Sequence, residues 1–172
     1  MSKTPPLLPA ELMRRTLRTA HFDGLSILVL SGLFALVSAS AQDKLGTVVG
    51  LMVAGAGAIE LHGAGLVRHG EFKGMKWLVL SQLYLLATIL GFVRYKLGHV
   101  DLGFLRQAFS YMSTDQKQQL LQPGFTEDES LGAMYSALYY LIALLTIPYQ
   151  GGMALYYLRR RRAVAAALAQ GA

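Results

Sequence analysis

Four long apolar stretches dominate the hydrophobic pattern of this chain. They cover residues 25–41, 48–67, 77–93 and 131–158. Because a helix rises about 1.5 Å per residue, about 20 apolar residues cross the hydrocarbon core of a bilayer. With their flanking residues, the stretches predict spans at about 20–41, 47–67, 76–94 and 131–158. The expected fold is an all-α membrane protein, a four-transmembrane-helix bundle that forms a single domain over residues 1–172.

The long interval at 97–130 predicts amphipathic interfacial helices between the third and fourth spans. An apolar residue recurs every three or four positions from Leu102 onward, which indicates a first short helix. Ser113 and Gln116 have the spacing of a capping box and predict a second short helix that ends before Pro123.

The residues before the first span mix apolar and basic side chains. Pro9 stands where a first helical residue tolerates proline, and Arg14, Arg15 and Arg18 follow among leucines. This pattern predicts either a short amphipathic helix in the headgroup plane or a solvated basic tail. The same arginines, before a run that ends in Ala-Ser-Ala at 39–41, resemble a secretory signal. The run is long enough to cross a bilayer, and we therefore interpret it as a span.

Composition supports a membrane protein, since 53% of the residues are hydrophobic and only 15% are charged. A soluble domain carries about a quarter charged residues. The net charge of +6 comes from basic residues near the ends of the apolar runs, where they contact anionic lipid headgroups. No basic face with interleaved aromatics exists outside the spans, so the lipid bilayer, and not nucleic acid, is the expected partner.

The distribution of these basic residues predicts the orientation of the spans. Eleven of the sixteen fall on one side of the membrane: Lys3, Arg14, Arg15, Arg18, Arg68, Lys73, Lys76, Arg159, Arg160, Arg161 and Arg162. The other side has Lys44, Arg94, Lys96, Arg106 and Lys117. Lys and Arg accumulate on the cytoplasmic side. We therefore expect a multi-pass inner-membrane protein with cytoplasmic N- and C-termini and an outer loop at 97–130.

The second span is unusually rich in glycine and alanine. Gly50, Ala54, Gly57 and Gly63 are examples of small residues that recur along it. Small residues let helix backbones approach closely, and this packing drives helix association in lipid. The second span is therefore predicted to lie at the centre of the bundle or at a seam between subunits of a homo-oligomer.

Polar groups from all four spans fall in one layer about 9–14 Å from the cytoplasmic end of each helix. The layer comprises Ser26, Glu60, His62, Gln82, Tyr149 and Gln150. His21 and Asp23 lie nearer the surface and are not assigned to the layer. A carboxyl group at the depth of Glu60 is costly unless it is paired or protonated. Glu60 is therefore expected either to bind an ion or proton, or to hydrogen-bond to neighbouring helices as a packing contact.

Histidines near this layer raise two alternatives. His62 lies about 200° around the helix from Glu60, so the two side chains face different neighbours. A metal site could join Glu60 to His21 or Gln82, and a haem could bind between His21 and His62 if both imidazoles faced inward. No spacing establishes either arrangement, so no metal or cofactor is assigned.

The fourth span contains Pro148 followed closely by Gly151 and Gly152. Proline removes a backbone donor, and paired glycines ease bending. The segment therefore predicts a helix break at the depth of the polar layer, with a plain proline kink as the alternative. Aromatic residues near the span ends are interpreted as interface anchors: Trp77, Tyr135, Tyr139, Tyr140, Tyr156 and Tyr157.

The chemical inventory does not favour an enzyme. The chain has no cysteine, no phosphate-binding glycine loop, no nucleophile or zinc-protease motif, and no carboxylate pair on one face of a span. The expected function is an oligomeric channel or transporter that moves ions or protons through the layer around Glu60. The alternatives are a non-catalytic subunit or assembly factor of a larger membrane complex, and a haem- or metal-binding electron-transfer module.

Overall fold

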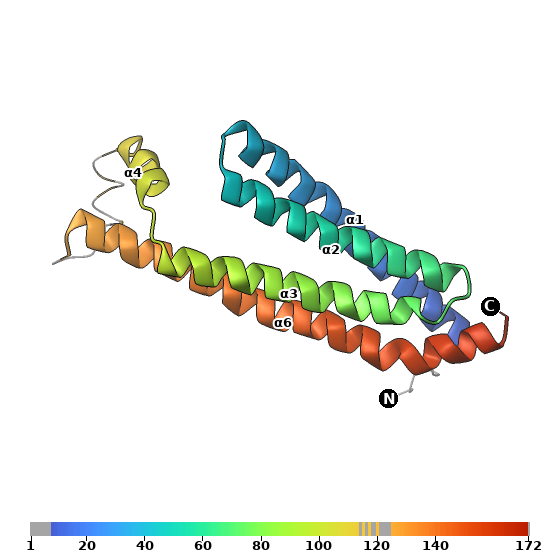
Figure 1. Ribbon diagram of the computed structural model, residues 1–172. Helices are drawn as coiled ribbons and strands as arrows, with labels where there is room; N and C mark the ends of the chain where they lie inside the picture. Colours follow the sequence, from blue (N-terminus) through green and yellow to red (C-terminus); the bar gives the residue numbers. More distant parts are fainter. Residues whose placement is uncertain (1–7, 114, 116, 118–119, 121–124, 172) are drawn as a thin grey trace, which may run out of the picture. The chain divides into compact units, whose positions relative to one another are not determined.

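The computed structural model describes residues 8–113, 115, 117, 120 and 125–171 (Figure 1). Its helices are α1 (Pro9–Ser40), α2 (Lys44–Arg68), α3 (Gly74–Gly98), α4 (Gly103–Ser110) and α6 (Glu127–Ala169). No strand occurs among the described residues. The helices α1, α2, α3 and α6 are each long and apolar enough to cross a membrane. The predicted all-α fold with four membrane-spanning helices is confirmed, and the chain is a multi-pass membrane protein.

By its packing, the chain divides into two compact units. Unit 1 comprises Met1–Thr88 and Ile147–Ala172, and unit 2 comprises Ile89–Thr146. The helices α3 and α6 therefore contribute one part to each unit. The apolar core of unit 1 is made by side chains from α1, α2, α3 and α6: Ala20, Ala64, Val67, Met75, Leu78, Tyr157 and Val164.

In unit 1, α1 begins before its predicted span and α6 ends after its predicted span. The N-terminal segment was predicted as a separate amphipathic helix or a solvated tail, and both predictions are wrong for the described residues. Instead, α1 runs unbroken from Pro9, which occupies the first helical position as expected. Met13 and Leu17 pack against the core of unit 1. Burial of this apolar face keeps the segment in line with the span.

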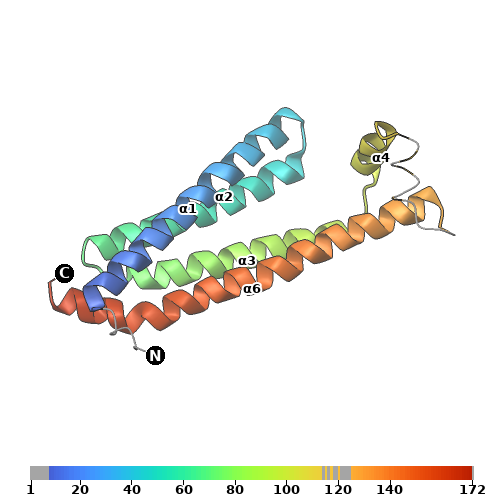
Figure 2. The ribbon, with the colours of Figure 1, turned by 180° about the vertical axis from the view of Figure 1, so that it is seen from behind.

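At the other end of the chain, α6 continues past the predicted span end at residue 158 as far as Ala169. Val164 and Ala167 are fully buried in unit 1. Figure 2 shows this last part of α6 beside the first turns of α1. The two extensions therefore stabilise each other through apolar contact.

The sequence predicted a helix break at Pro148. An unwound turn there is wrong, because α6 is helical throughout Glu127–Ala169. Gly151 and Gly152 are part of the same helix, and an added Cβ at either would meet nothing within 4 Å. A proline removes a single donor, whereas unwinding a turn would leave several backbone groups without partners in lipid. The helix therefore continues through the proline.

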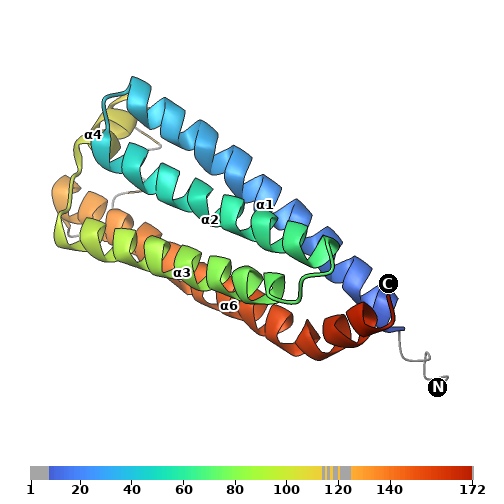
Figure 3. The same cartoon turned by 45° about the vertical axis from the view of Figure 1, so that its right-hand side comes forward.

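In unit 1, α1 and α2 lie side by side (Figure 3), and small residues let their backbones approach closely. A Cβ added at Gly57 would lie 2.6 Å from the carbonyl oxygen of Gly24 and 2.7 Å from the backbone nitrogen of Leu28. Towards α3, a Cβ at Gly63 would lie 3.0 Å from the carbonyl oxygen of Gly74. The four small residues singled out in the sequence are all buried: Gly50, Ala54, Gly57 and Gly63. In unit 1, α2 therefore packs closely against both of its neighbours.

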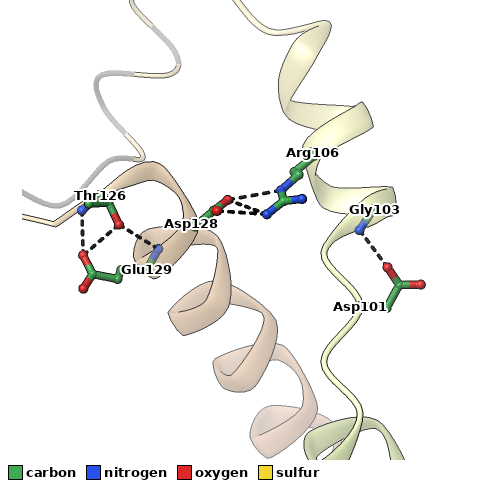
Figure 4. Close-up of polar contacts among 6 residues, drawn as sticks. All are labelled: Asp101, Gly103, Arg106, Thr126, Asp128 and Glu129. Atoms are coloured by element: carbon green, nitrogen blue, oxygen red, sulfur yellow. Dashed lines mark hydrogen bonds and ion pairs between the residues drawn. The ribbon is translucent and has the colours of Figure 1, made fainter.

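Unit 2 contains α4, which confirms the amphipathic helix predicted from Leu102 onward. The second predicted helix, at Ser113 and Gln116, falls largely outside the described residues. Arg106 of α4 donates hydrogen bonds to both carboxylate oxygens of Asp128 at 2.9 Å (Figure 4). Both side chains are more than half exposed, so this ion pair contributes at most about 1 kcal/mol.

The first turn of α6 in unit 2 is closed by a capping box (Figure 4). The Thr126 backbone N–H donates to Oε2 of Glu129 at 2.8 Å, and the Glu129 N–H donates to the Thr126 hydroxyl at 3.3 Å. The two bonds satisfy donors at the helix start that have no partner within the helix. Glu129 precedes the apolar stretch at 131–158. The Thr126 backbone N–H, with help from its hydroxyl, lowers the pKa of Glu129 below its ordinary value of 4.5.

We predict that replacing Gly57 by Ala destabilises the protein by about 1–3 kcal/mol, because the new Cβ would press α1 and α2 apart. Gly55 is the matched control, since a Cβ there meets nothing within 4 Å. Gly55→Ala should be neutral or stabilising by up to about 1 kcal/mol. Unfolding in detergent micelles measures both variants. Equal effects of the two substitutions would contradict the close contact.

We predict that the capping box makes the start of α6 pH-dependent. A lowered pKa means that the stabilising contribution of Glu129 is present above the ordinary glutamate pKa and is lost as the pH falls through the folded pKa. The carboxyl signal of Glu129 in an NMR titration should therefore have a midpoint below 4.5. Thr126→Val removes the hydroxyl bond and should raise that midpoint. A midpoint that does not move in the variant would show that the hydroxyl has no role.

Candidate functional site

A polar cluster in unit 1 joins one or more side chains from each of α1, α2, α3 and α6. Gln82 is its centre, because Nε2 of Gln82 donates to Oε2 of Glu60 at 2.8 Å and to Oδ2 of Asp23 at 3.2 Å. The Tyr157 hydroxyl donates to Oε1 of Glu60. The Tyr149 hydroxyl donates to Oδ1 of Asp23 at 3.0 Å. We call these five residues the carboxyl cluster.

The carboxyl cluster is buried at one end and exposed at the other. Glu60, Gln82 and Tyr157 have no exposed surface, and Asp23 is 9% exposed. Tyr149 is 55% exposed. A continuous series of hydrogen bonds therefore leads from an exposed phenol, through two carboxyl groups and an amide, to a buried phenol.

Close packing of α1 on α2 positions the two carboxyl groups. A Cβ added at Gly24, the residue after Asp23, would lie 3.2 Å from Cβ of Glu60 and 3.1 Å from the carbonyl oxygen of Gly57. A larger residue at either glycine would separate the helices. The pair of glycines therefore allows two carboxyl groups from different helices to reach one amide nitrogen on α3.

The charges of the carboxyl cluster are not balanced by a basic side chain. In the described part of the chain, no Lys, Arg or His forms an ion pair with Asp23 or Glu60. An unpaired carboxylate in a membrane span is costly, and two ionised carboxylates that share one hydrogen-bond donor repel each other. The arrangement is therefore suited to take up a positive charge, either a proton or a small cation.

This region also contains two buried amide oxygens, one on α3 and one on α6. Oε1 of Gln82 and Oε1 of Gln150 have no hydrogen-bond partner among the described residues. A buried polar atom without a partner costs about 1–3 kcal/mol. The free oxygen of Gln82 belongs to the same amide that bridges Asp23 and Glu60. A rotation of this amide would therefore offer an acceptor to a protonated carboxyl group.

The structure brings together three of the residues that the sequence placed in one layer: Glu60, Gln82 and Tyr149. Gln150 is buried nearby on α6 but makes no hydrogen bond to the cluster. Ser26 is half-buried and lies outside the hydrogen-bonded series. His62 is exposed, and its ring stands edge-on to Trp77 with centroids 5.6 Å apart.

Two members of the cluster were missed in the sequence. Asp23 was placed nearer the membrane surface and left out of the layer, but the structure buries it against Gln82 and Tyr149. Tyr157 was interpreted as an interface anchor, which is wrong, because it has no exposed surface. Tyr157 packs with Ala20 of α1 and Ala64 of α2 in the apolar core of unit 1, and Asp23 is held by its hydrogen bonds to Gln82 and Tyr149. A sequence signal existed for Tyr157, which lies seven residues after Gln150 and hence on the same helix face.

A second signal marks the face of α1 near Asp23. Buried small residues recur along this helix at Thr16, Ala20, Gly24, Ser31, Ala35 and Ser38. This spacing of three, four or seven residues identifies the side of α1 that packs on protein. Asp23 lies at the edge of that stripe.

The haem and metal hypotheses find no matching geometry in unit 1. His21 and His62 are both exposed, so the inward-facing pair that a bis-histidine haem needs is not formed. Among the described residues, no three His, Cys, Asp or Glu side chains are grouped as metal ligands.

The chemistry of the carboxyl cluster limits what this region can bind. No protein-family model, curated protein or solved structure matches this chain. The cluster offers carboxylate, amide and phenol oxygens, which bind protons and hard cations. Its side chains therefore have the chemistry to accept a proton or a small cation.

We predict that Tyr157→Phe destabilises the protein by about 1.5–3 kcal/mol, because Glu60 would lose a buried hydrogen bond. The neighbouring Tyr156→Phe is the matched control and should have a smaller effect, since Tyr156 is only partly buried. Chemical unfolding in detergent micelles compares the two. A Tyr157→Phe protein as stable as the unaltered chain would contradict the assigned hydrogen bond.

Proposed function

We propose that this protein carries protons across its membrane and that the carboxyl cluster is the proton-binding site. The observation that supports the proposal is the pairing of Asp23 and Glu60 through one amide nitrogen of Gln82. Both carboxyl groups are buried, and neither is neutralised by a basic residue within the described ranges. Intramembrane carboxyl groups of this kind are typical of proton relays.

In this proposal, a proton reaches the carboxyl cluster through Asp23. Asp23 is the less deeply buried of the two carboxyl groups and was predicted to lie nearer the membrane surface, so it receives the proton first. The proton then passes to Glu60, the more deeply buried group. Tyr157 donates to Glu60 and stabilises its charge when the proton leaves.

Gln82 links the protonation of Asp23 to that of Glu60. When both carboxyl groups are ionised, its Nε2 donates to both, as in the observed arrangement. When one of them is protonated, rotation of the amide presents Oε1 as an acceptor for the new O–H. The unpartnered Oε1 is the feature that supports this exchange.

The proposed site does not require a second copy of the chain. All five residues of the carboxyl cluster belong to unit 1 of one molecule. Association into a homo-oligomer, which the small-residue helix led us to expect, would therefore place several independent sites side by side.

We predict that Glu60→Gln and Asp23→Asn each reduce proton flux to the level of protein-free vesicles, because each removes a carboxyl group that must bind the proton. The measurement uses purified protein in vesicles that enclose a pH-sensitive dye, with a potassium diffusion potential as the driving force. Glu71→Gln is the matched control, since Glu71 is an exposed acid that pairs with Lys73. This control should conduct protons like the unaltered protein.

Three results would contradict the proposed function. One is a folded Glu60→Gln protein, verified by circular dichroism and size-exclusion chromatography, that conducts protons normally. Another is flux by the unaltered protein that carries sodium without any change of internal pH. The third is an unaltered protein that conducts no protons at all, which would assign the carboxyl cluster to helix packing.

A further inference from the structure

A groove of about 790 Å³ opens beside the first half of α1 in unit 1. Arg14 and Arg18 of α1 line it together with Arg68, the last residue of α2. Its apolar lining comes from Leu17, Phe22 and Leu25. The groove lies outside the hydrogen-bonded carboxyl cluster and has a different chemistry.

The three arginines of the groove are not neutralised by the protein. All three are exposed, and none forms an ion pair within the described part of the chain. Their neighbour Arg15 differs, because it bonds Glu11 at 2.8 Å and does not line the groove. The groove therefore concentrates positive charge that an external anion can balance.

The apolar side chains of the groove are also exposed. Phe22 is 73% exposed and Leu25 is 44% exposed. From Arg14 to Leu25 the helix rises about 16 Å. Arg14 precedes the apolar stretch of α1 and Leu25 begins it, so the lining changes from cationic to apolar along the direction in which the helix enters the membrane.

We propose that this groove binds an anionic phospholipid. The guanidinium groups of Arg14, Arg18 and Arg68 would bind the phosphate, since guanidinium matches phosphate geometry through paired hydrogen bonds. An acyl chain would lie along Phe22 and Leu25. A free phosphate would leave the apolar lining uncovered, and a zwitterionic lipid would leave the positive charge unbalanced.

The test compares two variants with the same change in net charge. The groove variant carries Arg14→Gln, Arg18→Gln and Arg68→Gln. The control variant carries Arg15→Gln, Arg159→Gln and Arg162→Gln, three exposed arginines that do not line the groove. Native mass spectrometry of the purified protein, titrated with phosphatidylglycerol or phosphatidylcholine, measures the affinity for each lipid.

We expect the unaltered protein to retain phosphatidylglycerol in preference to phosphatidylcholine. The groove variant should bind phosphatidylglycerol about a hundredfold more weakly, and the control variant should bind it nearly as well as the unaltered protein. The replaced arginines are exposed, and the one ion pair that involves them within the described ranges, between Arg15 and Glu11, lies on the surface; both variants should therefore keep the fold, which circular dichroism verifies. If the triple variant unfolds, the three single variants test the proposal. Each should bind phosphatidylglycerol about fivefold more weakly than the unaltered protein.

Three outcomes would overturn the proposal. Equal loss in the groove and control variants would assign the affinity to diffuse surface charge. Equal binding of phosphatidylcholine would show that the arginines do not select the headgroup. Complete displacement of the lipid by inorganic phosphate would show that the groove is a site for free anions.

Discussion

The approach of α1 to α2 at Gly24 and Gly57 is the contact on which the rest of unit 1 depends. A Cβ at Gly57 would clash with the backbone of α1, and a Cβ at Gly24 would contact Gly57 and Glu60 more tightly than a side chain normally does. Asp23 directly precedes one of these glycines, and Glu60 lies one turn after the other. The close packing that holds the helices together therefore also sets the separation of the two carboxyl groups. Stability and site geometry have the same physical cause.

The same packing also buries two carboxyl groups close together. This has an electrostatic cost that the association of the two helices does not require. Small residues would suffice to join α1 and α2. The cluster instead buries two acids around one amide, leaves the amide oxygen without a partner, and includes no basic residue among those described. Buried polar groups that are not fully satisfied are expected where function opposes stability. This contrast is the physical reason for proposing a function for the carboxyl cluster and not for the exposed His62.

The arginines of unit 1 fall into two groups. Some cations act within the protein: Arg15 pairs with Glu11, and Arg161 lies over the Phe72 ring at 5.6 Å. Others, such as Arg14 and Arg68, have no ion-pair partner within the described ranges and line a groove with an apolar side. The positive charge of this chain thus both marks the ends of its helices and leaves a defined surface for an anion.

The sequence by itself determined the four long helices, because the number of consecutive apolar residues matches the thickness of a bilayer. It also predicted that Glu60, Gln82 and Tyr149 share one layer, since position along a helix sets the approximate depth of a residue. Only the tertiary structure decided which side chains meet, because that depends on the rotation of each helix and on its neighbours. Asp23 and Tyr157 belong to the site because the rotation of α1 and α6 turns their side chains towards Gln82 and Glu60, and Pro148 stays helical because lipid offers no partners to an unwound turn.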